Sequence, residues 1–342
     1  MAKPVKLNLI VDKSSKRVIF AESDRYFVDI LLLFLTLPLG SILQLTKQSI
    51  GSMNNLLKSV ETLDSVCFSS EACRSMLLCP SNSASHLLSS LSIKYDNISN
   101  LFRFYYTCSS SCSYRHISFY ANAHCPCGGL MNQQVEFVAD DAPSISAYSS
   151  AFFNVAFKFT ISDDLLVSQS SVEFSIEQLS KLDVKQMSSL ESVSVDVTAE
   201  NIVELLKRLL VSDTPLTDVF LGVHMVKDKL QVDIQQSLHA KCYETQAPTA
   251  SMRNISLKLY VNKDDTAVIA EVDNDFVDLL FGFLTYPIGA VISKLGGHSG
   301  FRCMDSIYNS VGALKPSNCF RNNELIGKLL NPKLPQFFKV KK

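Results

Sequence analysis

Apolar and polar residues alternate at the start of the chain as a half-buried β-strand requires. Val5, Leu7, Leu9 and Val11 are spaced two apart, and a period of two places them on one face of a strand. A polar turn follows at 13–16, and residues 17–22 read as the returning strand. The pattern predicts a β-hairpin over 5–22.

The next segment is apolar on nearly all sides. Asp24 stands where a helix N-cap is expected, and Asp29 lies within the first two turns, where a carboxylate interacts favourably with the helix dipole. The apolar character predicts a buried helix. Pro38 predicts that this helix bends or ends nearby, because the residue before a proline disfavours helical geometry. Further helices are predicted near 53–63 and 71–78.

The same pattern recurs near the other end of the chain. Residues 27–40 read FVDILLLFLTLPLG and residues 276–289 read FVDLLFGFLTYPIG, which share the skeleton F-V-D-x-L-x-x-F-L-T-x-P-x-G. The likeness extends upstream into the hairpin and downstream, so residues 5–81 and 255–333 are predicted to be two copies of one unit. We expect the two apolar helices to face each other about a pseudo-twofold axis, as two protomers would.

The middle of the chain holds a weaker echo of this unit, reading strand, turn, strand and helix over 157–179. An amphipathic helix is predicted over 198–211, capped by Thr198, and a strand or short helix over 213–220. The overall prediction is an α+β fold of repeated β-hairpin–helix units with an inserted zinc-ribbon-like β-hairpin module. The predicted segments are 1–95, 96–140, 141–240, a linker at 241–254, and a truncated second copy at 255–342.

Composition narrows the class of protein. The chain has 342 residues, of which 47% are hydrophobic and 19% charged, and 32 Lys+Arg against 33 Asp+Glu give a net charge of -1. These values exclude a disordered chain and a wholly basic nucleic-acid binder. The apolar runs at 30–43 and 279–292 are shorter than the roughly 20 residues of a membrane span and contain Pro and Gly, so no span is expected.

The first twelve residues lack the apolar core of a signal peptide. An intracellular, cytoplasmic location is therefore expected, and its reducing conditions favour thiols or metal ligands over disulfides.

Four of the ten cysteines concentrate in twenty residues, as Cys108, Cys112, Cys125 and Cys127. They occupy two turns among predicted strands at 101–107, 117–120 and 135–138, which is the plan of a zinc ribbon. Zinc prefers four soft ligands in a tetrahedron, so these cysteines would form a structural site, with His124 as a possible substitute ligand. Plain reduced cysteines, or redox chemistry with a disulfide, are the alternatives. The first pair has three spacer residues and the second only one.

No nucleotide-binding loop, zinc-protease motif or nucleophile elbow occurs in the sequence. Repetition without a catalytic signature favours a non-catalytic interaction or scaffold protein with an unidentified protein partner. An enzyme with a pocket between the two copies is the first alternative. Weak nucleic-acid binding through the cysteine-rich segment is the second, because Arg103, Tyr105, Tyr106 and Arg115 mix aromatic and basic character there, although hairpin packing is the simpler interpretation. The oligomeric state stays open.

These motifs together resemble one plant-restricted family, catalogued as domain of unknown function 674. The resemblance rests on the F-V-D skeleton after a hairpin, the paired cysteines, the sequence SDDLLVS at 162–168 and the sequence LTDVFL at 216–221. It implies two tandem units, of which the second is shortened here, and it implies no activity or catalytic residue, since none is established for the family. The family pattern has two spacer residues in the second cysteine pair, whereas Cys125 and Cys127 are separated by one.

Overall fold

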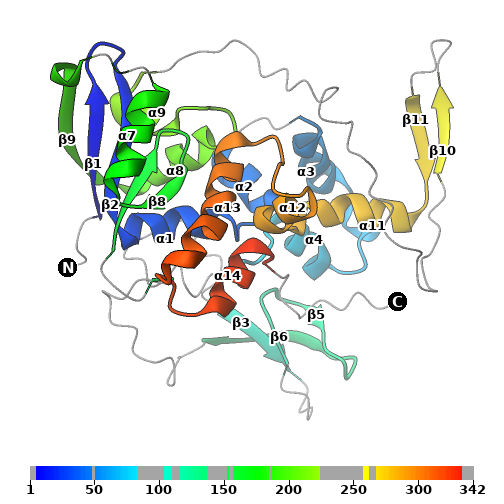
Figure 1. The fold of residues 1–342 in the computed structure, drawn as a ribbon. Helices are drawn as coiled ribbons and strands as arrows, with labels where there is room; N and C mark the ends of the chain where they lie inside the picture. Colours follow the sequence, from blue (N-terminus) through cyan, green and yellow to red (C-terminus); the bar gives the residue numbers. More distant parts are fainter. Residues whose placement is uncertain are drawn as a thin grey trace.

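The structure is a computed structural model that describes residues 5–47, 51–82, 104–109, 116–136, 152–153, 157–182, 184, 186–223, 257–261 and 267–332. Its fold is α+β, as predicted. The largest element is a five-stranded antiparallel sheet with the strand order β8-β7-β2-β1-β9, seen at the left of Figure 1. A two-stranded hairpin and a separate four-stranded sheet complete the β-structure among the described residues.

The first hairpin and its helix form where the pattern predicts them. Strands β1 (Val5–Asp12) and β2 (Arg17–Asp24) pair antiparallel, with a register shift between Ile10 and Val11. Helix α1 (Arg25–Phe34) begins at Asp24, whose carboxylate accepts a hydrogen bond from the Tyr26 N–H. This N-cap satisfies one of the backbone donors that a helix start leaves unpaired.

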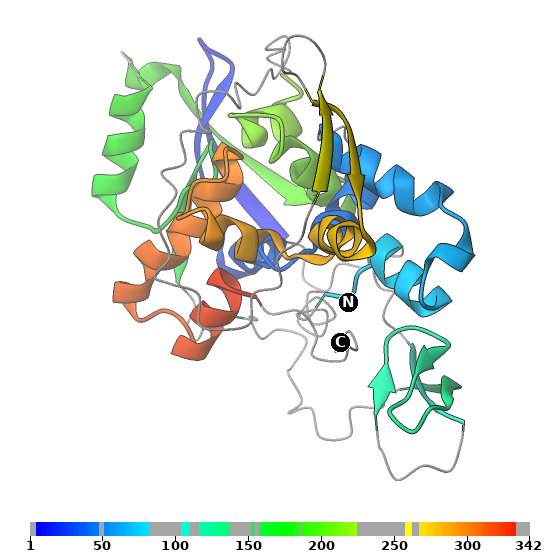
Figure 2. The ribbon, with the colours of Figure 1, turned by 90° about the vertical axis from the view of Figure 1, so that its right-hand side faces the viewer.

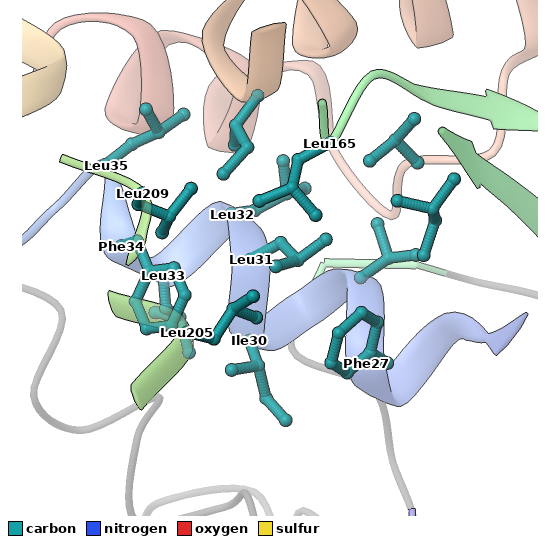
Figure 3. Packing of buried hydrophobic residues seen from close by; sticks show 14 of the residues in the cluster. Phe27, Ile30, Leu31, Leu32, Leu33, Phe34, Leu35, Leu165, Leu205 and Leu209 are labelled. Carbon is teal, nitrogen blue, oxygen red and sulfur yellow. The ribbon is translucent and has the colours of Figure 1, made fainter. Parts of the chain in front are cut away.

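Helix α1 lies at the centre of the main hydrophobic core (Figure 3). Every residue from Phe27 to Phe34 is buried, which confirms the predicted buried helix. Asp29 is the polar exception in this stretch, and its Oδ1 accepts a hydrogen bond of 3.2 Å from the Phe152 N–H. A buried carboxylate needs such donors, because unpaired burial would cost several kcal/mol.

The strands that flank this hairpin come from much later in the chain. Strand β7 (Lys158–Ser162) pairs with β2, and β9 (Leu190–Val197) pairs with β1 over eight residues. Strand β8 (Val167–Gln169) and helix α7 (Val172–Lys181) complete the strand, turn, strand and helix predicted for this region. The sheet therefore joins strands from the predicted segments 1–95 and 141–240; the division of the chain into domains stays a prediction.

Two helices follow β9. Helix α8 (Ala199–Arg208) carries a capping box between Thr198 and Asn201, as the predicted amphipathic helix requires. The region 213–220, predicted as a strand or short helix, contains the short helix α9 (Pro215–Leu221).

The two ends of the chain contain the same order of elements. After α1 come α2 (Leu39–Thr46), α3 (Ser52–Thr62), the 3-10 turn η1 (Ser65–Cys67) and α4 (Glu71–Leu78). After strands β10 (Leu257–Val261) and β11 (Ala267–Val272) come α11 (Asn274–Gly282), η4 (Phe283–Thr285), α12 (Ile288–Lys294), α13 (Arg302–Leu314), η5 (Lys315–Ser317) and α14 (Asn323–Leu330). Asp273 caps α11 as Asp24 caps α1, and β10–β11 has its register shift between Tyr260 and Val261, matching Ile10 and Val11.

The two Thr-x-Pro-x-Gly sequences meet directly. Leu39 N–H donates to Tyr286 O and Ile288 N–H donates to Leu37 O, both at 3.0 Å, so that Pro38 and Pro287 form a two-residue antiparallel bridge. Exchanging the two sequences maps one bond onto the other, which is the pattern of a local twofold axis.

Close packing accompanies this bridge, because both sequences carry glycine at the crossing. A Cβ on Gly289 would stand 2.8 Å from Leu35 O, and one on Gly40 would stand 3.0 Å from Leu284 O. In the first unit α1 ends before Pro38, and in the second unit η4 ends before Pro287. A new helix starts after each proline, as the sequence predicts.

Among the described residues, every helix is too short or too polar to cross a membrane. The predicted linker at 241–254 lies outside the residues that the structure describes.

Candidate metal centre

A small four-stranded sheet carries the cysteine-rich segment. Its strands are β3 (Phe104–Cys108), β4 (Ile117–Ser118), β5 (Ala123–His124) and β6 (Leu130–Glu136), in the order β4-β3-β6-β5. The strands predicted at 101–107 and 117–120 correspond to β3 and β4, while β6 starts five residues before the strand predicted at 135–138. Figure 2 shows this sheet at the lower right, outside the main body of the molecule.

The sheet is attached to helix α4 through one tyrosine and a few apolar side chains. Tyr120 Oη donates a hydrogen bond of 2.7 Å to Cys79 O, just after α4, and burial raises the pKa of Tyr120 far above its ordinary value. Within the described residues, the buried cluster beneath the sheet is small, and its buried members are Ala72, Tyr120, Ala123, Cys125 and Met131. A core of this size contributes little stability, so a module of this kind gains from an additional cross-link.

Three thiols converge at one end of the sheet. The Sγ atoms of Cys108, Cys125 and Cys127 all lie within 4.8 Å of one another, and those of Cys108 and Cys127 are 3.5 Å apart. Cys125 is buried, Cys108 is half-buried and Cys127 is exposed. A separation of 3.5 Å is far longer than the roughly 2.05 Å of a disulfide, and it is close to the roughly 3.8 Å between two sulfurs of a tetrahedral zinc site with Zn–S bonds of about 2.3 Å.

The turn after β5 brings two of these thiols together. Cys125 N–H donates to Gly129 O at 2.9 Å, and Gly128 N–H donates to Cys125 O at 2.8 Å. Gly128 has φ +88 with open space at its Cβ position, a conformation that glycine adopts without strain. The turn therefore directs Cys125 and Cys127 to the same side despite their single spacer residue.

The structure brings together three of the four predicted cysteine ligands. Cys112 lies outside the described residues. His124 is exposed at the end of β5 and is not among the group of converging ligand atoms. Three thiolates leave one position of a tetrahedron for a fourth ligand, and the sulfur donors present suit zinc.

A second polar site was not predicted from the sequence. Asp163, which lies in the turn of the pattern predicted over 157–179, is buried and accepts hydrogen bonds from Thr217 N–H at 3.0 Å, Thr217 Oγ1 at 2.8 Å and Arg17 Nε at 3.0 Å. Burial raises the pKa of Asp163 to about 6, although these donors act in the opposite direction. Asp163 and Thr217 lie in the SDDLLVS and LTDVFL sequences, which are 54 residues apart and gave no sign of contact. The cluster joins the start of β2, the β7–β8 turn and α9.

An open hollow of 420 Å³ lies between β8 and the end of α13. Its polar lining comes from Ser168, Gln169, Ser171 and Ser317, and no ionisable side chain contributes to it. The buried Asp163 is not part of this lining. The hollow thus lacks the convergent ionisable groups that acid–base or nucleophilic catalysis requires.

Comparison with known proteins identifies the family. The family model described as "Protein of unknown function (DUF674)" matches residues 1–342, and the chain belongs to this family. Neither the search of curated proteins nor the search of solved structures finds a match.

Proposed function

We propose that this member of the DUF674 family is a non-catalytic interaction protein whose cysteine-rich sheet is held together by a structural zinc ion. The convergence of three Sγ atoms within 4.8 Å carries the metal assignment. Cys108, Cys125 and Cys127 would supply three thiolates, and zinc would cross-link the end of β3 to the turn after β5. The predicted fourth ligand remains Cys112. A site with four protein ligands has no open position for substrate, so the ion would stabilise the fold only.

The experiment is metal analysis of the purified full chain together with its Cys108→Ser and Cys127→Ser variants. We expect about one zinc per wild-type chain and a loss of most of it in each variant, since removal of one ligand of a structural site weakens binding strongly. Cys67→Ser is the matched control, because Cys67 is exposed in η1 and outside the thiol cluster. Wild-type protein that contains no zinc, and whose thermal unfolding is unchanged by a chelator, would overturn the assignment.

The interaction role is supported by apolar side chains that the second hairpin–helix unit leaves exposed. Leu279 and Phe283 are 46% and 42% exposed, and Tyr286 is 42% exposed. The ring centroids of Phe283 and Tyr286 lie 6.3 Å apart, and contiguous exposed apolar side chains are typical of binding surfaces. The proposed setting is the cytoplasm of a plant cell, where the plant source is what the family resemblance implies and the location stays a prediction.

Separate co-purifications of bound protein with the wild-type chain, the Leu279→Asp variant and the Phe283→Asp variant test this role. We expect bound protein with the wild-type chain and loss of that protein with either variant, because a charge opposes burial of this surface. Val172→Asp on α7 is the control, since Val172 is also exposed, at 70%, but on another part of the molecule. Identical recovery from all four chains would contradict a role for this surface.

Two alternatives remain predictions. Catalysis between the two units would need ionisable groups around a cavity there. Nucleic-acid binding by the cysteine-rich sheet would show affinity that falls as salt rises, and an absence of such dependence would reject it.

A further inference from the structure

The β10–β11 hairpin has unpaired edges in the part of the chain that the structure describes. Its sheet contains two strands only, and in Figure 1 it stands apart from the five-stranded sheet. Ile269 on β11 is 62% exposed and its cross-strand partner Tyr260 is 44% exposed. A two-stranded hairpin of this kind is at best marginally stable in water by itself.

Strand β11 also carries few of the features that protect natural sheet edges from pairing. Its sequence, Ala-Val-Ile-Ala-Glu-Val, has no proline and no lysine, which are common protective residues at edges. Its one charge, on Glu271, is already balanced by Lys258 at 3.7 Å on the neighbouring strand. The edge therefore offers backbone donors and acceptors with little electrostatic opposition.

The first unit shows what covers such an edge. There, β2 pairs antiparallel with β7, the edge strand of another β-hairpin, through residues Phe20–Asp24. By the sequence match, the corresponding stretch of the second unit is 269–273. In the first unit, the edge of β2 is thus covered by a second hairpin, β7–β8, which pairs with it edge to edge and antiparallel.

We propose that β11 pairs antiparallel with β11 of a second copy of this chain, forming an intermolecular sheet with the order β10-β11-β11-β10. A twofold axis makes identical strands antiparallel, which is the arrangement that β2 and β7 already display. Helix α11 follows β11 directly, and the established contact between the two units lies on α11 and η4, where Phe281 and Leu284 are buried in one cluster with Leu43. This inference deepens the proposed function by naming the partner, and it does not depend on the cysteine site.

The test is sedimentation of the full-length chain over a range of concentrations, with Ile269→Lys as the disrupting variant. Lysine on an edge strand opposes pairing. Because Ile269 is exposed, the substitution empties no core position, and circular dichroism checks directly that the fold is retained. Ile176→Lys on α7 is the matched control, because Ile176 is also an exposed isoleucine, at 57%. We expect a concentration-dependent dimer that Ile269→Lys weakens at least about tenfold and that Ile176→Lys leaves unchanged.

Hydrogen exchange at β11 gives a second measurement on the same samples. Amides of 269–272 should exchange more slowly as the wild-type dimer forms, and not in Ile269→Lys. A monomer at every concentration overturns the proposal, whether β11 exchanges slowly because its own chain covers it or quickly because it is free. A dimer that Ile269→Lys leaves intact overturns it as well. A monomer that still co-purifies with another protein would remove the second copy as partner while leaving the interaction role in place.

Discussion

The two hairpin–helix units share one sequence skeleton but differ in what surrounds them. In the first unit, β1 and β2 are central strands and α1 is buried along its length. In the second unit, β10 and β11 pair only with each other among the described residues, and Phe281 is the one buried residue of α11. Asp29 is buried and bonded to Phe152 N–H, whereas its counterpart Asp278 is exposed. The comparison shows that the shared apolar pattern produces a strand edge and a helix that other segments must cover. In the first unit those segments include β7 and β9, which lie outside the unit.

The largest expected effect is a difference in stability loss when equivalent phenylalanines of the two units are replaced by alanine. Phe34→Ala should lower the free energy of unfolding by about 3–5 kcal/mol, because it empties a packed core position; Phe34 is 5% exposed. Phe283→Ala, at the equivalent position, should cost less than about 1 kcal/mol in the monomer, since little transfer or cavity cost arises at an exposed site. Chemical denaturation measures both. Equal losses would show that the second unit is covered as fully as the first.

A smaller effect is expected where the units touch. Gly289→Ala should destabilise by about 1–3 kcal/mol, because the added methyl group meets backbone oxygens of Leu35 and Leu329 at 2.8 Å and the packed bridge must shift. Gly327→Ala in α14 is the control, since nothing lies within 4 Å of its Cβ position and alanine favours a helix interior by up to about 1 kcal/mol. If both substitutions behaved alike in thermal or chemical denaturation, the close approach at Gly289 would be refuted.

The last effect is a dependence on pH and concerns the polar cluster around Asp163, which Arg17 links to the first unit. The native pKa of Asp163 is about 6 against an ordinary value of 3.8, so the folded chain binds more protons than the unfolded chain between these values. The free energy of unfolding should therefore fall as pH rises from about 4 to 6, by at most about 1.4 kcal/mol per pH unit from this group.

Asp163→Asn should remove this part of the pH dependence, and Asp164→Asn at the exposed neighbouring position should retain it. Denaturation curves at several pH values measure the difference. A slope identical in the wild type and Asp163→Asn would show that Asp163 titrates normally in the folded protein.

The local sequence pattern predicted the helices and hairpins more fully than it predicted which strands pair with one another. The β1–β2 hairpin, the capped helix α1 and the end of helix near Pro38 follow from alternation, capping and proline geometry, all of which act within a few residues. Strand β9 was not predicted, although Val193, Val195 and Val197 alternate, because alternation in an edge strand does not reveal that it pairs with β1 some 180 residues away.

The candidate site was predictable to a similar extent. Cysteine spacing indicated a cluster, and three of the four cysteines converge. The Asp163 cluster was not predictable, because an Asp-Asp pair in a turn carries the same local signal whether it is exposed or bonded to a distant threonine. Burial of that kind depends on tertiary packing, which no short window of sequence contains.

The bridge between Pro38 and Pro287 also constrains the order of events during synthesis. The apolar helix α1 is synthesised before its covering strands β7 and β9, which lie more than 100 residues later, and Leu37 bonds to Ile288. Contacts of such sequence separation form slowly, and incomplete chains expose apolar surface that promotes aggregation. We therefore expect the unit that contains α1 to keep apolar surface exposed until the segment around Ile288 has been synthesised.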